Sequence, residues 1–409
     1  MAAARMSRRA ALRWALAGAA LGRAAPVSAA DWKLRRLPAA TLWRQFQAAP
    51  DGTWLGIDRD GRLWQAGGAG IAPPALRGEG LSPDAALASG HGRLVALRQD
   101  GRLWVGGDAG DAGISDITMA KAAGLLVLPL AVIGVAGEGL AAQLVRLEPG
   151  GAGSWQVVAR SAEPVLPDAR PVQVDLDGRG DDGHLAVLAG PDRTRYAHAV
   201  LGDDIEATRV LWLERHGLKP LRVLELPAPQ VFEHNQLVSW PAGQAAAGLW
   251  SVRSGAAGAQ LVLIEADPAD RNALRVAAAG AAIGTRNRWM SPSTDGQHIV
   301  AVHTPHLGGV LHRYRREGER LTATRLFDGL SNHAIGSHEL DVSAWVEGRW
   351  VLPDLSRRRL MVVDVERGVV EAQFDLAADL RQLAAQPGTG VCACLTEDGA
   401  VQILQRARR

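Results

Sequence analysis

The sequence has very little cysteine, because Cys392 and Cys394 are the only two in 409 residues. Both lie in the segment GVCACLTEDG, which reads as a β-strand, so the two side chains should face the same side. A bridge between such close neighbours would strain the strand. We therefore expect two buried thiols in a protein that does not depend on disulfides.

Lysine is also scarce, and almost all of the 45 basic residues are arginine. The arginines are scattered along the chain and are balanced by 43 acidic residues, which gives a formal net charge of +2. A nucleic-acid-binding protein would gather its basic residues on one element. We therefore expect no nucleic-acid partner.

Several signatures of catalysis and cofactor binding are missing. The chain has no G-x-S-x-G motif, no C-x-x-C-H haem-attachment motif and no phosphate-binding loop. A repeated tryptophan motif of the quinoprotein kind is absent as well. These absences exclude the enzyme classes that carry such motifs and make binding the first hypothesis.

Long hydrophobic runs are few. The most apolar stretch is GLLVLPLAVIGVAGEGLAAQLV (Gly124–Val145), which Pro129, Glu138 and several glycines interrupt. Its apolar core is shorter than the roughly 18 residues of a membrane-spanning helix. We predict two buried strands here and no membrane span in the mature chain.

The first 29 residues resemble an export signal. They contain a basic start, an apolar stretch (Trp14–Gly22) and a small-residue end (Val27–Ala29), and they are too short to span a membrane. The pair Arg8–Arg9 resembles the twin-arginine signal. Ala11 replaces the usual aromatic residue, so the ordinary secretion route is the alternative.

Cleavage near Ala29 would release a mature domain of residues 30–409 into the periplasm or the medium. Residues 1–29 contain five arginines and no acidic residue, so their removal takes the formal charge from +2 to about −3. The basic character of the whole chain therefore belongs largely to the signal.

The pentapeptide DGRLW occurs twice, at Asp60–Trp64 and at Asp100–Trp104. Asp-Gly between alternating apolar residues is a strong hairpin signal, and we expect each copy at the edge hairpin of a repeated sheet. Similar hairpins or strands begin near Thr53, Arg93, Leu126, His184, Leu249, Gln297, Arg349 and Gly390. Their mean step of about 48 residues is typical of a four-stranded propeller blade with its loops. The sequence predicts an all-β fold, a single propeller of eight four-stranded blades, with seven as the alternative.

The two ends of the chain are predicted to close the ring. The last unit offers three strands before the chain ends, and WKLRRLP (Trp32–Pro38) offers one more. An N-terminal strand that completes the last blade would remove an open sheet edge.

Three stretches resemble known propeller repeats. DGRLWVGG resembles the repeats of regulator-type and chromosome-condensation-regulator-type propellers, and LMVVDVERGVVEAQF (Leu360–Phe374) resembles those of surface-layer and quinoprotein propellers. VDLDGRGDDGHLAV (Val174–Val187) resembles the calcium loop of integrin-type FG-GAP repeats. Each resemblance covers one or two blades, so together they imply the architecture and no single family. Function does not follow from this fold.

The FG-GAP-like loop contains candidate calcium ligands. Asp175 and Asp177 match the alternating carboxylates of such loops, and Asp181 or Asp182 could supply a later ligand. Arg179 stands where a third acidic ligand is expected. A calcium site and a metal-free turn both stay open.

Strand alternation places the loops of a propeller on two opposite faces. We name the strands of each blade A to D from the centre outward. The B–C and D–A connections then share one face, and the A–B and C–D turns share the other. In the sixth blade RWMSPS, HIVAVHT, VLHRYRRE and LTATRLF are predicted as A to D. The echo of AIGTRNRW in AIGSHELD, 52 residues on, marks successive D–A connections.

Unusual polar residues gather on the face of the B–C and D–A connections. His303 and His306 begin the B–C loop of the sixth blade, and His333 and His338 follow in the next D–A connection. Four imidazoles brought together there could bind a transition metal. Neighbouring connections add Arg195, Tyr196, His198, Asp203, Asp204, Glu233, His234, Asn235, Arg286, Asn287 and Arg288. Plain turns such as RDG, TDG and REGER are expected on the opposite face.

These observations favour an exported propeller that binds a partner protein or a small ligand on its loop-rich face, without catalysis. The alternative is a metal- or quinone-dependent periplasmic enzyme that uses the histidine cluster. Calcium and a histidine-bound transition metal are the candidate cofactors.

Overall fold

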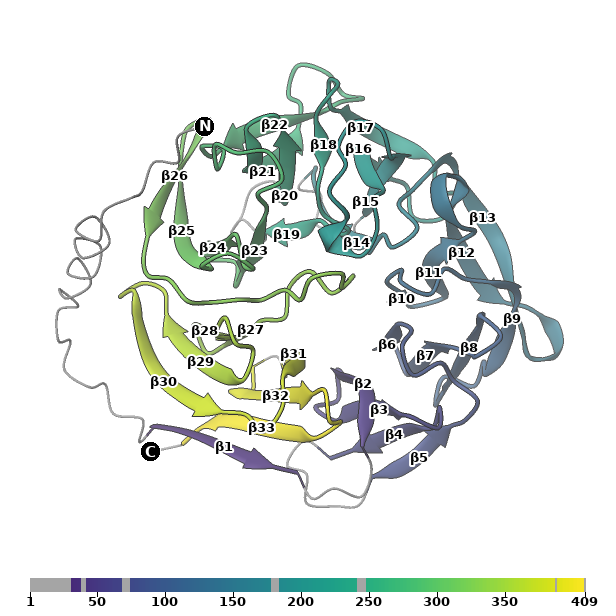
Figure 1. Ribbon diagram of the computed structural model, residues 1–409. Helices are drawn as coiled ribbons and strands as arrows, with labels where there is room; N and C mark the ends of the chain where they lie inside the picture. The colour runs from purple at the N-terminus through teal and green to yellow at the C-terminus, as the bar shows by residue number, and fades with distance from the viewer. Residues whose placement is uncertain are drawn as a thin grey trace, which may run out of the picture.

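The computed structural model describes residues 31–37, 42–67, 74–177, 184–240, 248–386 and 388–407. The predicted all-β class is confirmed, and Figure 1 shows the strands arranged as radial sheets around a ring. Within the described ranges the only helices are three short 3₁₀ turns, η2 (Gly139–Ala141), η3 (Gly151–Gly153) and η4 (Ala199–Leu201).

Antiparallel units of four strands follow one another along the chain, and in each the first strand lies nearest the centre (Figure 1). The first four units contain β2 (Trp43–Ala48), β3 (Trp54–Asp58), β4 (Leu63–Ala66) and β5 (Ala75–Gly78); β6 (Leu87–Gly90), β7 (Arg93–Leu97), β8 (Arg102–Gly107) and β9 (Gly113–Thr118); β10 (Leu126–Leu128), β11 (Ala131–Ala136), β12 (Gln143–Pro149) and β13 (Ser154–Pro164); β14 (Val172–Val174), β15 (His184–Asp192), β16 (Glu206–Leu213) and β17 (Pro220–Glu225).

The later units follow the same plan. They contain β19 (Val238–Trp240), β20 (Gly248–Gly255), β21 (Gly258–Ala266) and β22 (Leu274–Ala279); β23 (Met290–Thr294), β24 (Ile299–His303), β25 (Val310–Glu317) and β26 (Arg320–Arg325); β27 (Ala344–Val346), β28 (Arg349–Pro353), β29 (Arg359–Asp364) and β30 (Val369–Asp375); β31 (Leu380–Gln386), β32 (Val391–Thr396), β33 (Val401–Arg406) and β1 (Trp32–Arg36). The short strand β18 (Val231–Phe232) bridges β16 and β20. Each hairpin start predicted from the sequence falls in a different unit. We call these units blades one to eight.

The N-terminal strand lies beside the last strand of the chain. β1 pairs with β33 in antiparallel register from Trp32↔Arg406 to Arg36↔Gln402. The Trp32 side chain is buried between blades seven and eight, and the Arg406 guanidinium lies over its ring at 5.8 Å. Both ends of the chain therefore contribute to one sheet.

The hydrophobic cores lie between neighbouring blades, because each sheet packs against another on both of its faces. Phe46 and Trp54 of blade one pack with Leu395 and Ile403 of blade eight. A sheet covered on both faces favours apolar runs over strict alternation, and every residue of β3 is buried.

The repeated pentapeptide does not lie at a sheet edge, so that expectation is wrong. DGRLW joins β3 to β4 in blade one and β7 to β8 in blade two, which are the two middle strands of each sheet. The RDG turn is therefore a B–C connection on the loop-rich face and not on the opposite one. Gly61 and Gly101 have φ angles of +78° and +81°, a backbone region that favours glycine.

Several local predictions are confirmed. The apolar stretch forms β10, β11 and the start of β12, and both cysteine thiols are free and buried. The strands of blade six fall where the sequence placed them. No helix in the described part of the chain is long and apolar enough to cross a membrane. The export signal lies outside the described residues.

The connection from β26 to β27 is long and leaves the outer rim of the ring. Residues 326–343, which we call the strap, run across the middle of the ring towards β10 and β14 in Figure 1. The strap carries His333, His338 and the second AIG echo, so it brings residues of a late blade to the early half of the ring.

Candidate functional site

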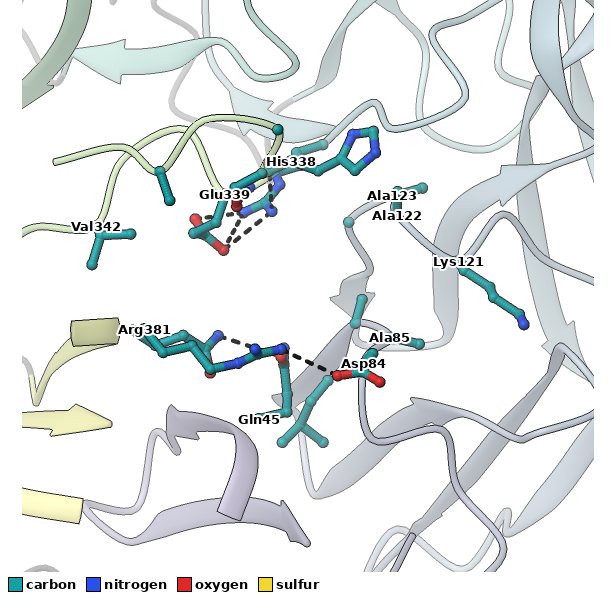
Figure 2. Close-up of a pocket in the computed structure, with 18 of the residues that line it drawn as sticks. Gln45, Asp84, Ala85, Lys121, Ala122, Ala123, His338, Glu339, Val342 and Arg381 are labelled. Carbon is teal, nitrogen blue, oxygen red and sulfur yellow. Dashed lines mark hydrogen bonds and ion pairs between the residues drawn. The ribbon is translucent and has the colours of Figure 1, made fainter. Parts of the chain in front are cut away.

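A hollow of about 620 Å³ lies where the inner ends of several blades meet the strap (Figure 2). Its walls come from B–C turns, D–A connections and the first strands of the blades. The charged residues among its lining are Asp84, Lys121, Arg170, His338, Glu339, Arg357, Arg381 and Glu397. The hollow therefore opens on the face where the sequence placed the unusual loops.

Ion pairs organise most of the charge in the hollow. Arg381 lies 3.2 Å from the Asp84 carboxylate and 3.3 Å from that of Glu397. On the opposite wall, Arg170 pairs with Glu339 of the strap at 3.1 Å. The charges of the wall are thus fixed in place before any ligand arrives.

Arg357 is a cation of this wall that has a donor without a partner. Its Nη2 donates to the Leu380 carbonyl, while Nη1 is buried without a hydrogen-bond partner among the described residues. Burial lowers the pKa of the guanidinium. An oxygen acceptor bound in the hollow would satisfy this group.

Hydrogen bonds hold the strap against blades four to six. The Gly336 N–H donates to the Val200 carbonyl at 2.8 Å, and Asn235 Nδ2 donates to the His338 carbonyl at 2.8 Å. Further along, Ser291 Oγ donates to the Leu340 carbonyl at 2.7 Å. These bonds hold the strap in place as one wall of the hollow.

Five of the residues predicted from three separate loops come together behind the strap. Tyr196, His198, Glu233 and Asn287, with Ser254, form what we call the Glu233 cluster. The Glu233 carboxylate is fully buried and accepts hydrogen bonds from His198 Nδ1 and Ser254 Oγ. The Asn287 N–H donates to the Tyr196 hydroxyl at 2.7 Å. The fifth predicted residue, Arg286, lies over the Tyr196 ring at 5.1 Å.

The Glu233 cluster is arranged to hold loops and not to activate a nucleophile. Ser254 and His198 each bond the same carboxylate, whereas an activated serine would bond to the imidazole. Burial raises the pKa of Glu233 against the opposing effect of these two bonds, and it raises the pKa of Tyr196 to about 12. The cluster thus fixes the long B–C insertion of blade four.

The four histidines proposed as one metal site lie in three different settings. His306 Nε2 lies 2.8 Å from His333 Nδ1, so these two are in contact. His303 instead bonds the Tyr314 hydroxyl at 2.6 Å and stacks on His312. His338 bonds Asp168.

Burial keeps two of these histidines neutral. It lowers the pKa of His303 to about 3 and that of His333 to about 4. The four residues are on the predicted face, but only His306 and His333 contact each other, and His303 and His338 each bond a different residue.

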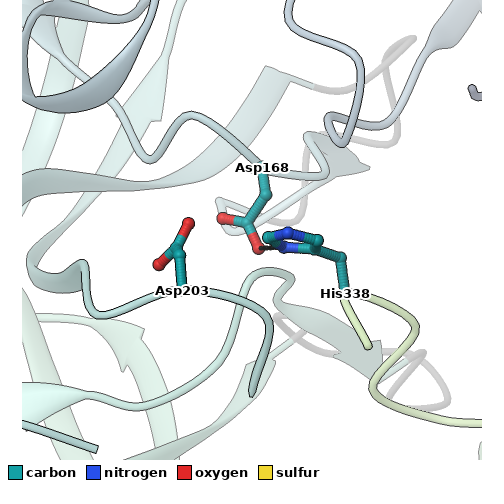
Figure 3. Close-up of side chains that lie close together, drawn as sticks. All are labelled: Asp168, Asp203 and His338. Atoms are coloured by element: carbon teal, nitrogen blue, oxygen red, sulfur yellow. Dashed lines mark hydrogen bonds and ion pairs between the residues drawn. The ribbon is translucent and has the colours of Figure 1, made fainter. Parts of the chain in front are cut away.

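His338 belongs to a different group, with Asp168 and Asp203 (Figure 3). The imidazole Nδ1 lies 2.9 Å from Asp168 Oδ2, and this bond is the main reason that the pKa of His338 is raised. Burial raises the pKa of Asp203. Asp168 was missed from the sequence, although it lies in the D–A connection into blade four, where the loop rule would have found it.

The remaining candidates have structural partners. Arg195 Nη1 donates to the Leu226 carbonyl at 3.0 Å. His234 and Asn235 are buried next to the part of the strap that contains His338. Asn235 Nδ2 contacts both Asp168 and the His338 carbonyl.

The calcium-type loop is only partly described. The Asp177 N–H donates to Asp175 Oδ1 at 3.1 Å, which makes a local turn. Asp181 and Asp182 lie outside the described residues.

The fold resembles solved β-propellers at low sequence identity. Sqt1 from Saccharomyces cerevisiae matches with 12% identity and a TM-score of 0.57, over 92% of this chain and 98% of that chain. BamB from Moraxella catarrhalis matches with 12% identity and a TM-score of 0.53, over 92% and 97%. The propeller domain of Cps50 (Swd1) from Myceliophteria thermophila matches with 9% identity and a TM-score of 0.50, over 91% and 99%.

These likenesses confirm the predicted propeller architecture and show the fold alone. No protein-family model matches the chain, and no curated protein matches it. Any functional conclusion therefore depends on the residues of the loop-rich face.

Proposed function

We propose that this protein is an exported, non-catalytic β-propeller that binds a partner protein on the face formed by its B–C and D–A connections. The observation that carries the proposal is an exposed apolar rim on the same face as the charged hollow. Leu307, Ile335 and Leu355 are 61%, 70% and 41% exposed. All three lie in connections of this face.

Backbone hydrogen bonds place two of these apolar residues in adjoining turns. The Gly329 N–H donates to the Gly308 carbonyl and the Leu355 N–H donates to the Gly329 carbonyl, each at 2.9 Å. Leu307 and Leu355 therefore flank the base of the strap. Ile335 lies near the other end of the strap and lines the hollow.

This pattern fits a protein partner better than a small ligand. Protein interfaces combine apolar anchors with a polar rim, whereas small-molecule pockets are mostly apolar and enclose their ligand. Here the hollow is charged, and of the three exposed apolar side chains on this face Ile335 lines it. A partner that inserts a polar segment could reach Arg357 while its apolar residues cover the three anchors.

Charge substitution on the apolar rim tests the proposal. We expect Ile335→Asp, and Leu307→Asp more weakly, to reduce the affinity for the partner that co-purifies stoichiometrically from the native periplasm by at least tenfold, about 1.4 kcal/mol. The matched control is Leu130→Asp, because Leu130 is 71% exposed in the A–B turn of blade three on the opposite face. Equal losses for Ile335→Asp and Leu130→Asp would contradict the face assignment.

Export is part of the proposal and has its own test. The support is the basic, apolar and small-residue order of residues 1–29. Replacing Arg8 and Arg9 with lysine should leave the precursor in the cytoplasm, measured by fractionation and immunoblotting. Normal delivery of the double-lysine variant would instead show the ordinary secretion route.

A further inference from the structure

Asp168, Asp203 and His338 converge from three connections that lie far apart in the sequence (Figure 3). Two carboxylate oxygens and one imidazole nitrogen, one atom from each side chain, all lie within 4.8 Å of one another. Among the residues that the structure describes, this is the group of His, Cys, Asp or Glu side chains with that geometry.

We propose that these three side chains bind one divalent transition-metal ion. Two carboxylates and an imidazole form a ligand set that suits Zn²⁺ and related ions. The imidazole distinguishes the site from a calcium site, since Ca²⁺ takes oxygen ligands. The ion would replace the proton that His338 Nδ1 and Asp168 Oδ2 now share.

Hydrogen bonds support the two carboxylates and the backbone that carries the imidazole. Asn235 Nδ2 lies 3.2 Å from Asp168 Oδ2, and the Ile205 N–H donates to Asp203 Oδ1 at 2.8 Å. The His338 carbonyl accepts a hydrogen bond from Arg170 Nη2 at 3.2 Å as well as one from Asn235. Such supporting bonds are typical of metal sites, where they fix ligand direction.

Gly202 leaves the space that the His338 ring occupies. A Cβ atom at this position would lie 2.5 Å from His338 Nδ1, closer than real Cβ contacts allow. The φ angle of Gly202 is +109°, which also favours glycine. The backbone next to Asp203 is therefore shaped to admit an imidazole beside that carboxylate.

A second observation points to a bound ion independently of the three ligands. A small cavity of about 10 Å³ adjoins them and is lined by residues that include Asp168, Asp203, Glu206 and His234. Glu206 is only 4% exposed, so its carboxyl group lies almost completely out of solvent beside the two proposed carboxylate ligands.

His234 supplies an unmatched donor to the same cavity. It is 4% exposed, and its Nδ1 accepts a hydrogen bond from the Gln236 N–H at 3.0 Å, so a neutral ring carries its proton on Nε2. That Nε2 is buried without a hydrogen-bond partner among the described residues. A cavity of this size holds one water molecule. A metal-bound water there would accept a hydrogen bond from His234 Nε2 and could donate one to Glu206.

The three ligands also have an access route. A cleft of about 530 Å³ on their other side is lined by Asp168, Asp203 and His338 and continues past Lys121 and Glu138. An ion can therefore reach the ligands from solvent through this cleft, while Glu206 and His234 are each only 4% exposed.

Metal titration of the mature protein tests the site. After treatment with a chelator, the protein is titrated with Zn²⁺ in two buffers of different ionisation enthalpy. We expect one equivalent of Zn²⁺ per chain, and the two buffers together measure how many protons leave when the ion replaces the hydrogen bond between Asp168 and His338. Binding of Ca²⁺ without Zn²⁺ would overturn the assignment of the imidazole as a ligand.

Variants and matched controls locate the bound ion. Asp203→Asn and His338→Ala should each weaken Zn²⁺ affinity by at least about 100-fold, more than the loss of a supporting residue causes. Asp204→Asn and His216→Ala change a neighbouring acid and an exposed histidine, and both should bind Zn²⁺ as the parent does. Zn²⁺ should raise the melting temperature of the parent and not that of Asp203→Asn.

Two outcomes would overturn the site. One is that the parent chain binds no Zn²⁺ at equimolar concentration. The other is that Asp203→Asn keeps the parent affinity, which would place the ion elsewhere. The isosteric Asp203→Asn change keeps the test valid if His338→Ala fails to fold. The partner-binding measurements do not enter this test, so the two proposals can fail separately.

Discussion

The B–C connections of blades one and four differ in length and in the residues that support them. In blade one four residues join β3 to β4, and Asp58 alone organises the turn by accepting hydrogen bonds from the Asp60 N–H, the Arg62 N–H and Trp64 Nε1. In blade four the connection from β15 to β16 is longer, contains η4 and buries Tyr196. One turn is local and the other is held by distant blades.

The difference shows where a propeller can carry specific chemistry. The partners of Asp58 lie within six residues of it. His198 instead meets Glu233 35 residues on, and Asp168 meets His338 170 residues on. Repetition produces short turns that stabilise a blade, and departures from repetition produce the polar clusters under the loop-rich face.

The largest expected effect on stability comes from removing β1, the N-terminal strand that pairs with the last strand of the chain. Deleting Trp32–Arg36 removes β1, with its buried tryptophan, and exposes the edge of β33. We expect a loss of at least about 4 kcal/mol in the free energy of unfolding, the scale of removing a buried tryptophan, together with aggregation. Denaturant unfolding and light scattering measure both effects. Unfolding like that of the parent would mean that β1 does not close the ring.

The next effect separates the two kinds of B–C connection. Glu233→Ala should destabilise the fold by about 3 kcal/mol, because it leaves His198 and Ser254 without their buried partner. Asp60→Ala, in the local turn of blade one, should leave the denaturation midpoint nearly unchanged, since that side chain is exposed. Denaturant unfolding at pH 7 compares the two. Equal losses of stability in the two variants would contradict the view that distant contacts hold the blade-four connection while local ones hold that of blade one.

The smallest effect concerns His303, a partly buried histidine that bonds Tyr314 and none of the other three candidate histidines. Its folded pKa of about 3 lies below the ordinary value of 6.5, so the unfolded chain takes up the proton first. This group therefore lowers stability as the pH falls from 6.5 towards 3, by up to about 1.4 kcal/mol per pH unit.

The stability advantage of the parent over His303→Asn should accordingly shrink between pH 7 and pH 4.5. Thermal unfolding at a series of pH values measures that difference. A constant difference across the range would show that His303 is not held neutral by burial.

Much of the fold was predictable from the sequence, since it rests on short-range patterns. The Asp-Gly turns, the apolar runs and the AIG echo mark strands and D–A connections directly. The position of DGRLW within its sheet was not predictable from the pentapeptide, since both an edge and a middle hairpin need the same turn. The pairing of Asp168 with His338 depends on the path of the strap, which no local pattern encodes.

The sequence predicted on which face of the ring the candidate residues lie. It did not predict which of them contact one another. Loop topology placed Tyr196, His198, Glu233 and Asn287 on one side, and they do meet there. The same reasoning grouped four histidines of which only His306 and His333 meet, because topology fixes the face of a residue but not the direction of its side chain.

Site-specific photo-crosslinking in the native host tests partner binding on the loop-rich face most directly. A photoreactive residue at position 335, on the strap, should give a discrete crosslinked partner in the periplasm. The same residue at position 130, equally exposed on the opposite face, should give none. Crosslinks of equal yield and pattern at the two positions, or a partner captured only at position 130, would contradict binding on the loop-rich face.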